Sequence, residues 1–190
     1  MRICLVSSSF YPATFYGGPI SATWDLSKKL AKKGVEIYVS TTNANGRKKL
    51  DVERNRYLEK EVNVFVKYYN EQIINKFSLS FIFSIWSDIK KSDIVYIQYL
   101  FHYTVLFSLL FSVIQHKKII ICPRGSFSEF TLSNKLTFFK NLWLSLCIKP
   151  FANQITWQAS SYLEEFDIKK KLPFSTVEII NDGVDFQSFQ

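Results

Sequence analysis

The sequence predicts an α/β fold in which a Rossmann-like parallel sheet is covered by helices on both faces. Short apolar runs rich in Val and Ile recur along the chain, as in parallel strands that are buried on both sides. Longer stretches whose apolar residues have helical spacing lie between these runs. Because strand and helix patterns alternate throughout, a parallel sheet with helical crossovers is the expected architecture.

The chain opens with a strand and a glycine-containing loop. Residues 2–7 form an apolar run that predicts the first buried strand. Tyr11-Pro12 and Gly17-Gly18 predict a loop, after which a helix begins at Pro19, an accepted first helical position. Lysines near the end of this helix complement its dipole, and Gly34 ends it.

The remaining elements continue the alternation. Strands are predicted over residues 35–41, 62–68, 93–98, 117–122, 153–157 and 177–180, helices over 77–90, 101–115, 132–149 and 161–166, and a polar loop over 43–56. The helix over 132–149 is predicted from Leu132, Leu136, Phe139, Leu142, Trp143 and Leu146, whose spacing forms one apolar face. Phe138 and Leu144 fall off that face.

Residues 94–115 contain no Asp, Glu, Lys or Arg, and 22 residues are enough to span a bilayer. Gln98 and His102 lie inside this run, however, and the run divides into a strand-like and a helix-like part. We therefore expect a strand followed by a helix in place of a membrane span.

The composition excludes several classes of protein. A chain of 190 residues with 18 Phe, 10 Tyr and 4 Trp is too aromatic for a disordered protein. Three cysteines are too few for a disulfide scaffold, and Cys4, Cys122 and Cys147 lie in apolar contexts without metal-ligand spacing. No secretory signal pattern begins the chain. The length suits one compact domain in a reducing compartment.

The formal net charge of +8 is unevenly distributed. Residues 1–126 hold 18 basic and 9 acidic side chains, whereas residues 127–190 hold 6 basic and 7 acidic ones. A basic segment of this kind can face phosphate, nucleic acid or anionic lipid, or it can be an ordinary solvated surface. Charge alone leaves these alternatives open.

Gly17 and Gly18 lie between the first predicted strand and the first predicted helix. Glycines allow backbone amides to approach a ligand closely, and a helix amino terminus favours anions. The loop is therefore a candidate phosphate site, although a mobile turn would have the same residues. It lacks both the G-x-G-x-x-G dinucleotide pattern and a Walker sequence, which argues against a dehydrogenase.

Four segments together resemble family 4 glycosyltransferases in order and spacing. They are Tyr11-Pro12 with Gly17-Gly18-Pro19, Leu26, Leu30 and Gly34-Val35-Glu36-Ile37-Tyr38-Val39, then Asp93-Ile94-Val95-Tyr96-Ile97-Gln98, then Cys122-Pro123-Arg124-Gly125-Ser126, and finally Val177-Glu178-Ile179-Ile180-Asn181-Asp182-Gly183-Val184-Asp185 with Phe189. The resemblance covers essentially the whole chain.

This resemblance implies a retaining enzyme of the GT-B fold, with two Rossmann-like domains that face a cleft. Residues 1–190 would be the acceptor-side, N-terminal domain, ending at an interdomain hinge over about 179–190, with the C-terminal nucleotide-sugar domain absent. A nucleotide-sugar co-substrate, without a further cofactor or metal, would supply a sugar to a glycan or lipid-linked acceptor. Bacterial surface polysaccharide synthesis in the cytoplasm is the implied setting, and the isolated domain is expected to be inactive.

The resemblance also implies roles for individual residues. Gly17 and Gly18 would approach the donor diphosphate, and Asp182 and Gly183 would form the hinge, with Asp182 where the family usually has Asn. Gln98 stands where the family often has His.

Three further side chains are candidates in the cleft, each with a structural alternative. His102, four residues after Gln98, is the candidate catalytic residue, although a His beside two aromatic residues can simply be packed. Arg124 suits a phosphate or carboxylate, or a salt bridge to a nearby acid. Glu164 matches a position near the cleft, or completes a capping box with Ser161.

A non-enzymatic module that binds anionic lipid through the basic segment is the main alternative function. The aromatic helical stretches, with Phe138, Leu144 and nearby Lys135 and Lys140, could also touch a membrane surface. Nucleic acid is not an expected partner, because the basic residues do not form a known reader motif.

Overall fold

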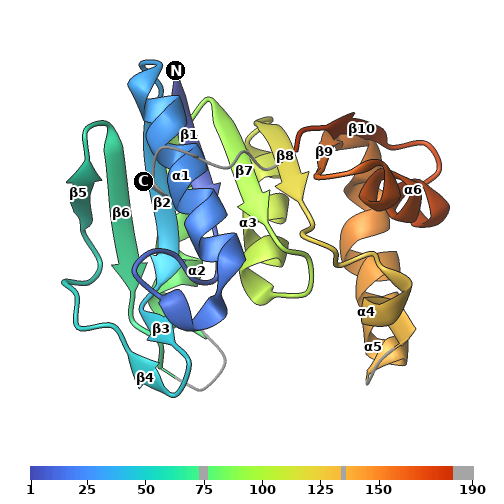
Figure 1. Cartoon of the computed structure of the whole chain (residues 1–190), viewed down its shortest axis with the longest axis horizontal. Coiled ribbons are helices and arrows are strands. Elements are labelled where there is room, and N and C mark those ends of the chain that lie inside the picture. The colour runs from blue at the N-terminus through green and yellow to red at the C-terminus, as the bar shows by residue number, and fades with distance from the viewer. Residues whose placement is uncertain (73–76, 134–135, 182–190) are drawn as a thin grey trace, which may run out of the picture.

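The computed structural model describes residues 1–72, 77–133 and 136–181 and has one large sheet with helices on both sides (Figure 1). Eight strands form this sheet in the order β10-β9-β8-β7-β1-β2-β6-β5. Neighbouring strands are parallel except for β5 and β6, which are antiparallel. Because β1 lies between β2 and β7, the chain adds strands first on one side and then on the other, as doubly wound folds do.

The elements have the following bounds. The sheet contains β1 (Arg2–Val6), β2 (Glu36–Thr42), β5 (Tyr57–Glu61), β6 (Val64–Tyr69), β7 (Ile94–Gln98), β8 (Lys118–Cys122), β9 (Ile155–Ala159) and β10 (Thr176–Ile179), and a small hairpin contains β3 (Ala44–Asn45) and β4 (Lys48–Lys49). The α-helices are α1 (Gly18–Lys32), α2 (Leu79–Lys90), α3 (Tyr103–Ile114), α4 (Glu129–Ser133), α5 (Thr137–Trp143) and α6 (Tyr162–Lys171). Short helical turns are η1 (Thr14–Tyr16), the π-helical η2 (Leu144–Ile148) and η3 (Lys149–Gln154). The predicted fold class is confirmed.

Alternation along the strands divides the interior into two cores. Ile3 and Leu5 of β1 pack in the core that α1 covers, whereas Cys4 and Val6 pack on the opposite face, in the core that α2 and α3 cover. Side chains of successive strand residues point to opposite faces, so both faces need apolar residues. This requirement explains why the strands are near-continuous apolar runs.

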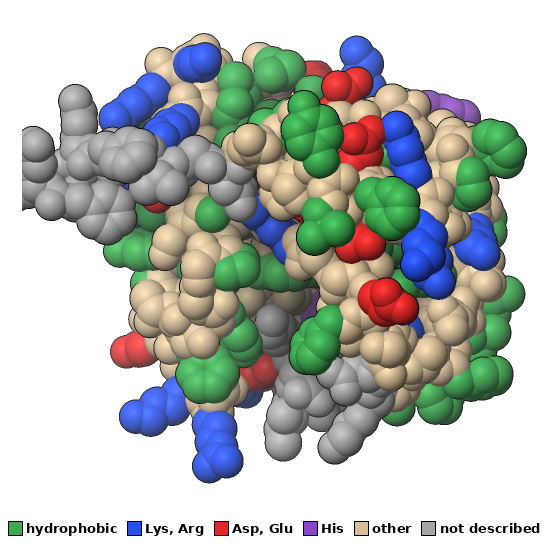
Figure 2. Space-filling view, turned by 45° about the vertical axis from the view of Figure 1, so that its right-hand side comes forward, with side chains coloured by type: hydrophobic (Ala, Val, Ile, Leu, Met, Phe, Trp, Pro, Cys, Tyr) green, Lys and Arg blue, Asp and Glu red, His purple; other side chains and the backbone are tan. Residues whose placement is uncertain are grey.

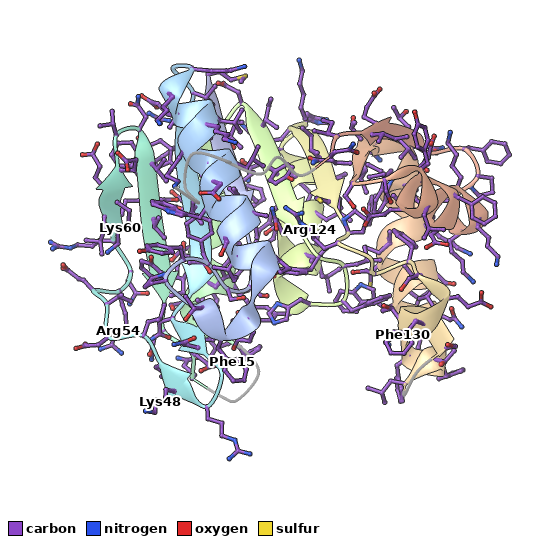
Figure 3. All side chains as sticks on the ribbon, viewed as in Figure 1. Phe15, Lys48, Arg54, Lys60, Arg124 and Phe130 are labelled. Atoms are coloured by element: carbon purple, nitrogen blue, oxygen red, sulfur yellow. The ribbon has the colours of Figure 1, made fainter. Side chains whose placement is uncertain are left out.

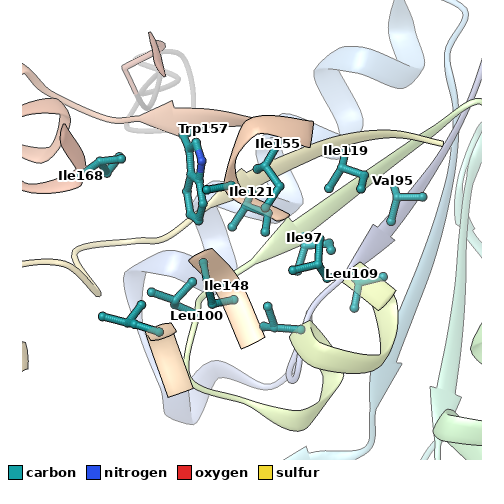
Figure 4. Close-up of a cluster of buried hydrophobic side chains, with 14 of the residues drawn as sticks. Val95, Ile97, Leu100, Leu109, Ile119, Ile121, Ile148, Ile155, Trp157 and Ile168 are labelled. Atoms are coloured by element: carbon teal, nitrogen blue, oxygen red, sulfur yellow. The ribbon is translucent and has the colours of Figure 1, made fainter. Parts of the chain in front are cut away.

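The larger core extends beneath β8 and β9 toward α6 (Figure 4). Trp157 of β9 is fully buried there, and its ring meets that of Phe127 edge-on at 5.4 Å between centroids. Ile168 packs into the same core from α6. The last third of the chain is thus joined to the sheet by apolar contacts.

Residues 94–115 form strand β7 followed by helix α3, as the sequence predicts. Val95 and Ile97 are fully buried in the larger core, where Val105 and Leu109 of α3 pack with them. Within the described residues, no helix is both long enough and apolar enough to cross a bilayer.

The prediction of one long helix over residues 132–149 is wrong. Leu136 has a left-handed backbone conformation, with φ at 72°, so the chain between α4 and α5 is not continuous helix. The π-helical turn η2 then shifts the helical phase after α5. As a consequence Leu144, predicted off the apolar face, is buried, while Phe139 and Leu146, predicted on that face, are exposed.

The polar loop predicted over residues 43–56 contains the β3–β4 hairpin, and the prediction also missed β5. β5 is an edge strand, and its five residues Tyr57–Glu61 include three charged side chains. The faces of β5 are partly or fully exposed, so it lacks the apolar run that identifies the buried strands.

The cysteine prediction holds for two of the three thiols. Cys4 and Cys122 are buried and Cys147 is half-buried, and none of the three forms a disulfide bond. Burial raises the pKa of the Cys4 thiol, and to a smaller degree that of Cys147. Small buried thiols of this kind pack as apolar side chains.

Candidate functional site

The carboxyl edge of the sheet is the lower edge in Figure 1 and gathers the predicted site residues. Gly17 and Gly18 follow β1, Gln98 ends β7, Arg124 follows β8 and Glu164 lies just after β9. Ligands of open parallel sheets bind at this edge, next to the strand where the order reverses. The sheet order therefore places these residues where the fold usually binds its ligands.

Gly17 is the N-cap of α1 and has φ at 72° and ψ at −149°. Side chains other than glycine rarely adopt this region. Among the described residues no side chain caps α1, and Pro19 lacks an amide hydrogen, so the amino end of the helix remains open to solvent. Both glycines are exposed. The loop can therefore present amide groups to an anion, as predicted from the sequence.

Gly17→Ala is expected to lower the free energy of unfolding by about 1–3 kcal/mol, because alanine is strained at this φ and ψ. Gly18→Ala is the matched control, since Gly18 has helical backbone and an added Cβ would meet no atom within 4 Å. Urea denaturation of both variants measures the difference. Equal stability of the two variants would contradict the assigned backbone conformation.

Gln98 connects the end of β7 to the first turns of α1. Its side chain is buried, and Oε1 accepts a hydrogen bond of 2.9 Å from the Thr23 hydroxyl. The same hydroxyl lies 2.6 Å from the Pro19 carbonyl oxygen, beside the glycine loop. Gln98 Nε2 is buried without a hydrogen-bond partner among the described residues. Gln98 therefore links the end of β7 to the first turns of α1, beside the glycine loop.

Arg124 follows β8 in a turn with positive φ, at 53°, and is labelled in Figure 3. Tyr99, which follows β7, also has positive φ, and its amide donates to the Cys122 carbonyl at 2.9 Å. Burial raises the pKa of Tyr99, and the positive charge of Arg124 partly opposes this rise. The two turns after β7 and β8 are therefore close enough for their side chains to interact.

Glu164 is buried and joins the turn after β8 to the turn after β9. Its Oε1 accepts from the Gly125 amide at 2.7 Å, and its Oε2 accepts from the amide and the hydroxyl of Ser160, both at 2.7 Å. Ser161 caps α6 by accepting from the Glu164 amide at 3.2 Å. The predicted capping box is thus half right, because the carboxylate bonds Ser160 and Gly125 and not the Ser161 amide.

His102 lies in a groove that the other predicted site residues do not line. It caps α3, with Nδ1 3.4 Å from the Thr104 amide and 3.0 Å from its hydroxyl. An apolar groove of about 530 Å³ includes His102 together with Phe101, Tyr103, Phe139 and Trp143, and Gln98, Arg124 and Glu164 do not line it. A capping role explains this histidine, and its catalytic role stays a prediction.

Asp182 and Gly183, the predicted hinge residues, lie outside the described residues. Sequence reasoning missed Thr23 and Ser160, which hold Gln98 and Glu164 in place. Both are hydroxyl side chains near the amino end of a helix, a common capping signal. The partner of Thr23 is 75 residues away, so the local pattern does not identify it, whereas Ser160 bonds Glu164 only four residues further on, next to the Ser161 that the capping box named.

Comparison with solved structures places the chain among glycosyltransferase folds. It is similar to sucrose-phosphate synthase from Thermosynechococcus elongatus, with 11% identity and a TM-score of 0.69 over 98% of this chain and 49% of that chain. It is also similar to HepE (Alr3699) from Anabaena in complex with UDP-glucose, with 13% identity and a TM-score of 0.63 over 98% of this chain and 45% of that one. No protein-family model and no curated protein matches. The chain thus has the fold of a GT-B glycosyltransferase domain and spans about half the length of these two proteins.

Proposed function

We propose that this chain is the acceptor-side domain of a retaining family 4 glycosyltransferase. The complete enzyme would transfer a sugar from a nucleotide-sugar donor to a glycan or lipid-linked acceptor, which this domain would bind. The reaction would serve surface polysaccharide synthesis at the cytoplasmic side of the membrane. The observation that carries the proposal is the set of braced turns at the carboxyl edge of the sheet, on a GT-B domain fold.

Two parts of this edge have distinct proposed roles. The glycine loop offers backbone amides to the donor diphosphate, since α1 begins there without a side-chain cap among the described residues. Arg124, on the turn that Glu164 holds, offers a fixed positive charge to a phosphate or carboxylate. A rigid turn of this kind reduces the entropy lost when a ligand is bound.

Sugar transfer by the full-length gene product tests the proposal. The 190-residue chain alone is expected to transfer no sugar, and the full-length product is expected to transfer one from a panel of nucleotide sugars that begins with UDP-glucose, the molecule bound to HepE. Arg124→Gln in the full-length product should lower kcat/KM by about tenfold, which corresponds to one lost charge-assisted hydrogen bond. A full-length product without a nucleotide-sugar domain would refute the proposal.

The exposed apolar side chains of α4, α5 and α6 support a peripheral membrane contact. Phe130 is 78% exposed and Phe138 is 72% exposed, and Figure 2 shows hydrophobic side chains spread over this side of the molecule. We call these side chains the exposed apolar set, and its members are Phe130 of α4, Phe138 and Phe139 of α5, Leu146 of η2, and Leu163 and Phe166 of α6. Large exposed apolar patches mark interaction sites with proteins or membranes.

Phe130→Ser combined with Phe138→Ser should weaken binding to phosphatidylglycerol vesicles by about tenfold or more, because each buried aromatic ring contributes roughly 1.5–3 kcal/mol. Co-sedimentation measures the bound fraction. Phe83→Ser is the matched control, since Phe83 is 81% exposed on α2 and does not belong to the exposed apolar set. A steep loss of wild-type binding with salt, together with no effect of the two serines, would favour the basic lipid-binding module instead.

A further inference from the structure

We propose that a pocket between η1 and the β3–β4 hairpin binds an anionic saccharide, that is, a pyranose that carries a carboxylate or a phosphate. The pocket has a volume of about 420 Å³ and is lined by Thr14, Phe15, Asn45, Arg47 and Lys48. The inference deepens the proposed function by naming the chemical class of the acceptor. The identification of the bound saccharide as the acceptor rests on that proposed function.

The pocket lies at the same edge of the sheet as the glycine loop. η1 follows β1 and leads directly into Gly17, and the hairpin follows β2, the parallel neighbour of β1. Figure 3 labels Phe15 and Lys48 near each other at this lower edge. A ligand in the pocket would therefore lie beside the proposed diphosphate loop, where an acceptor has to be placed.

Phe15 supplies an exposed aromatic surface that is nevertheless held in place. Its side chain is 68% exposed, and its ring lies against Gly46, where an added Cβ would be 2.7 Å from the ring. The Phe15 amide donates to Asn45 Oδ1 at 3.3 Å, and the Gly46 amide donates to the Tyr16 hydroxyl at 3.0 Å. The apolar C–H face of a pyranose packs well on such a ring, and a fixed ring loses little entropy when it binds.

Arg47 and Lys48 supply positive charge to the pocket. Both side chains are exposed, and within the described part of the chain neither has an ion-pair partner. Lys49, in contrast, donates to the Glu71 carbonyl. Among the residues that the structure describes, no acidic side chain lines the pocket, so its charge is complementary to an anion. An aromatic platform beside two exposed cations fits an acidic sugar better than a neutral one.

Calorimetric titration of the 190-residue chain tests this inference without donor or turnover. The probes are a hyaluronan tetrasaccharide for the carboxylate source, glucose 6-phosphate for the phosphate source, and glucose and inorganic phosphate as the separate halves. At least one acidic sugar is expected to bind about tenfold or more tightly than glucose and inorganic phosphate, because only it uses both the ring and the cations. Equal affinities for all four probes would overturn the proposal.

Variants separate the pocket from general positive charge. Arg47→Gln with Lys48→Gln should weaken the acidic sugar by about tenfold, and Phe15→Ala by about fivefold. Arg54→Gln with Lys60→Gln removes the same charge from exposed residues on the flank labelled in Figure 3 and should change the affinity less than about twofold. Equal weakening by the control pair, or wild-type affinity in Phe15→Ala, would refute the site.

Gly46→Ala provides an independent variant that leaves every pocket side chain in the sequence. Gly46 has φ at +67°, and the added Cβ forces the Phe15 ring to move. If circular dichroism shows a folded chain, the loss of affinity should match that of Phe15→Ala. Because these titrations involve no transfer, they can succeed or fail independently of the transferase assay.

Discussion

Asp88→Asn is expected to lower the free energy of unfolding by about 3–5 kcal/mol, because it leaves a half-buried lysine without its counter-charge. Asp88 and Lys67 form an ion pair of 2.9 Å in which the side chains are only 5% and 13% exposed. The Asp88 carboxylate also accepts a hydrogen bond of 2.9 Å from Ser40 and another from the Tyr69 hydroxyl. Burial and the charge of Asp88 raise the pKa of Tyr69, which keeps that hydroxyl a donor.

Urea denaturation with a surface control isolates this effect. Asp25→Asn breaks the Asp25–Lys28 pair, which is also 2.9 Å long but has both side chains about one-third exposed, and it should cost about 0–1 kcal/mol. Adding Lys67→Met to Asp88→Asn removes the unpaired charge and should restore part of the lost stability. If the double variant is less stable than Asp88→Asn, the ion pair is not the reason for the loss.

Glu164→Gln is expected to lower the free energy of unfolding by about 1.5–3 kcal/mol. The amide nitrogen of Gln would face a backbone N–H group whose hydrogen bond the carboxylate accepts in the native protein. The Glu164 carboxylate receives three hydrogen bonds, from Gly125 and from the amide and hydroxyl of Ser160. The single oxygen of a Gln side chain cannot replace both carboxylate oxygens. The variant should therefore also loosen the turn that carries Arg124.

The neighbouring Glu165 is the control for this variant. Its carboxylate pairs with Lys169 at 2.6 Å on the surface of α6, so Glu165→Gln should change stability by less than about 1 kcal/mol. Hydrogen exchange of the Gly125 amide measures the local effect and should be faster in Glu164→Gln alone. An unchanged exchange rate would show that Glu164 does not hold the turn.

Local pattern was enough to predict the architecture, and it failed where a pattern could be satisfied in more than one way. The strand and helix over residues 94–115 were predicted correctly, because Gln98 and His102 interrupt the apolar run and divide it into a strand-like and a helix-like part. The helix over 132–149 was wrong, because helical spacing does not reveal a left-handed residue such as Leu136 or a π-helical turn after it. β5 was missed because an edge strand needs no apolar run.

The candidate site was predicted as a set of loops and not as a set of contacts. Gly17 was selected from its loop, and Gln98 and Glu164 from the family resemblance; the sheet order brings these three and Arg124 to one edge, whereas His102 lies in a separate groove. Their partners could not be predicted. Glu164 bonds Gly125, which is 39 residues away, and Gln98 bonds Thr23, which is 75 residues away.

The sequence by itself determined the alternation of strands and helices, and with it the parallel sheet and the edge where ligands bind. These features depend on hydrophobic periodicity, which acts over a few residues and is written directly in the chain. Only the tertiary structure decided that Glu164 holds a turn, that His102 caps a helix, and that Phe15 lies against Gly46 beside two exposed cations. Polar partners and pockets come from segments far apart in the sequence, and their meeting depends on how the whole sheet is ordered and packed.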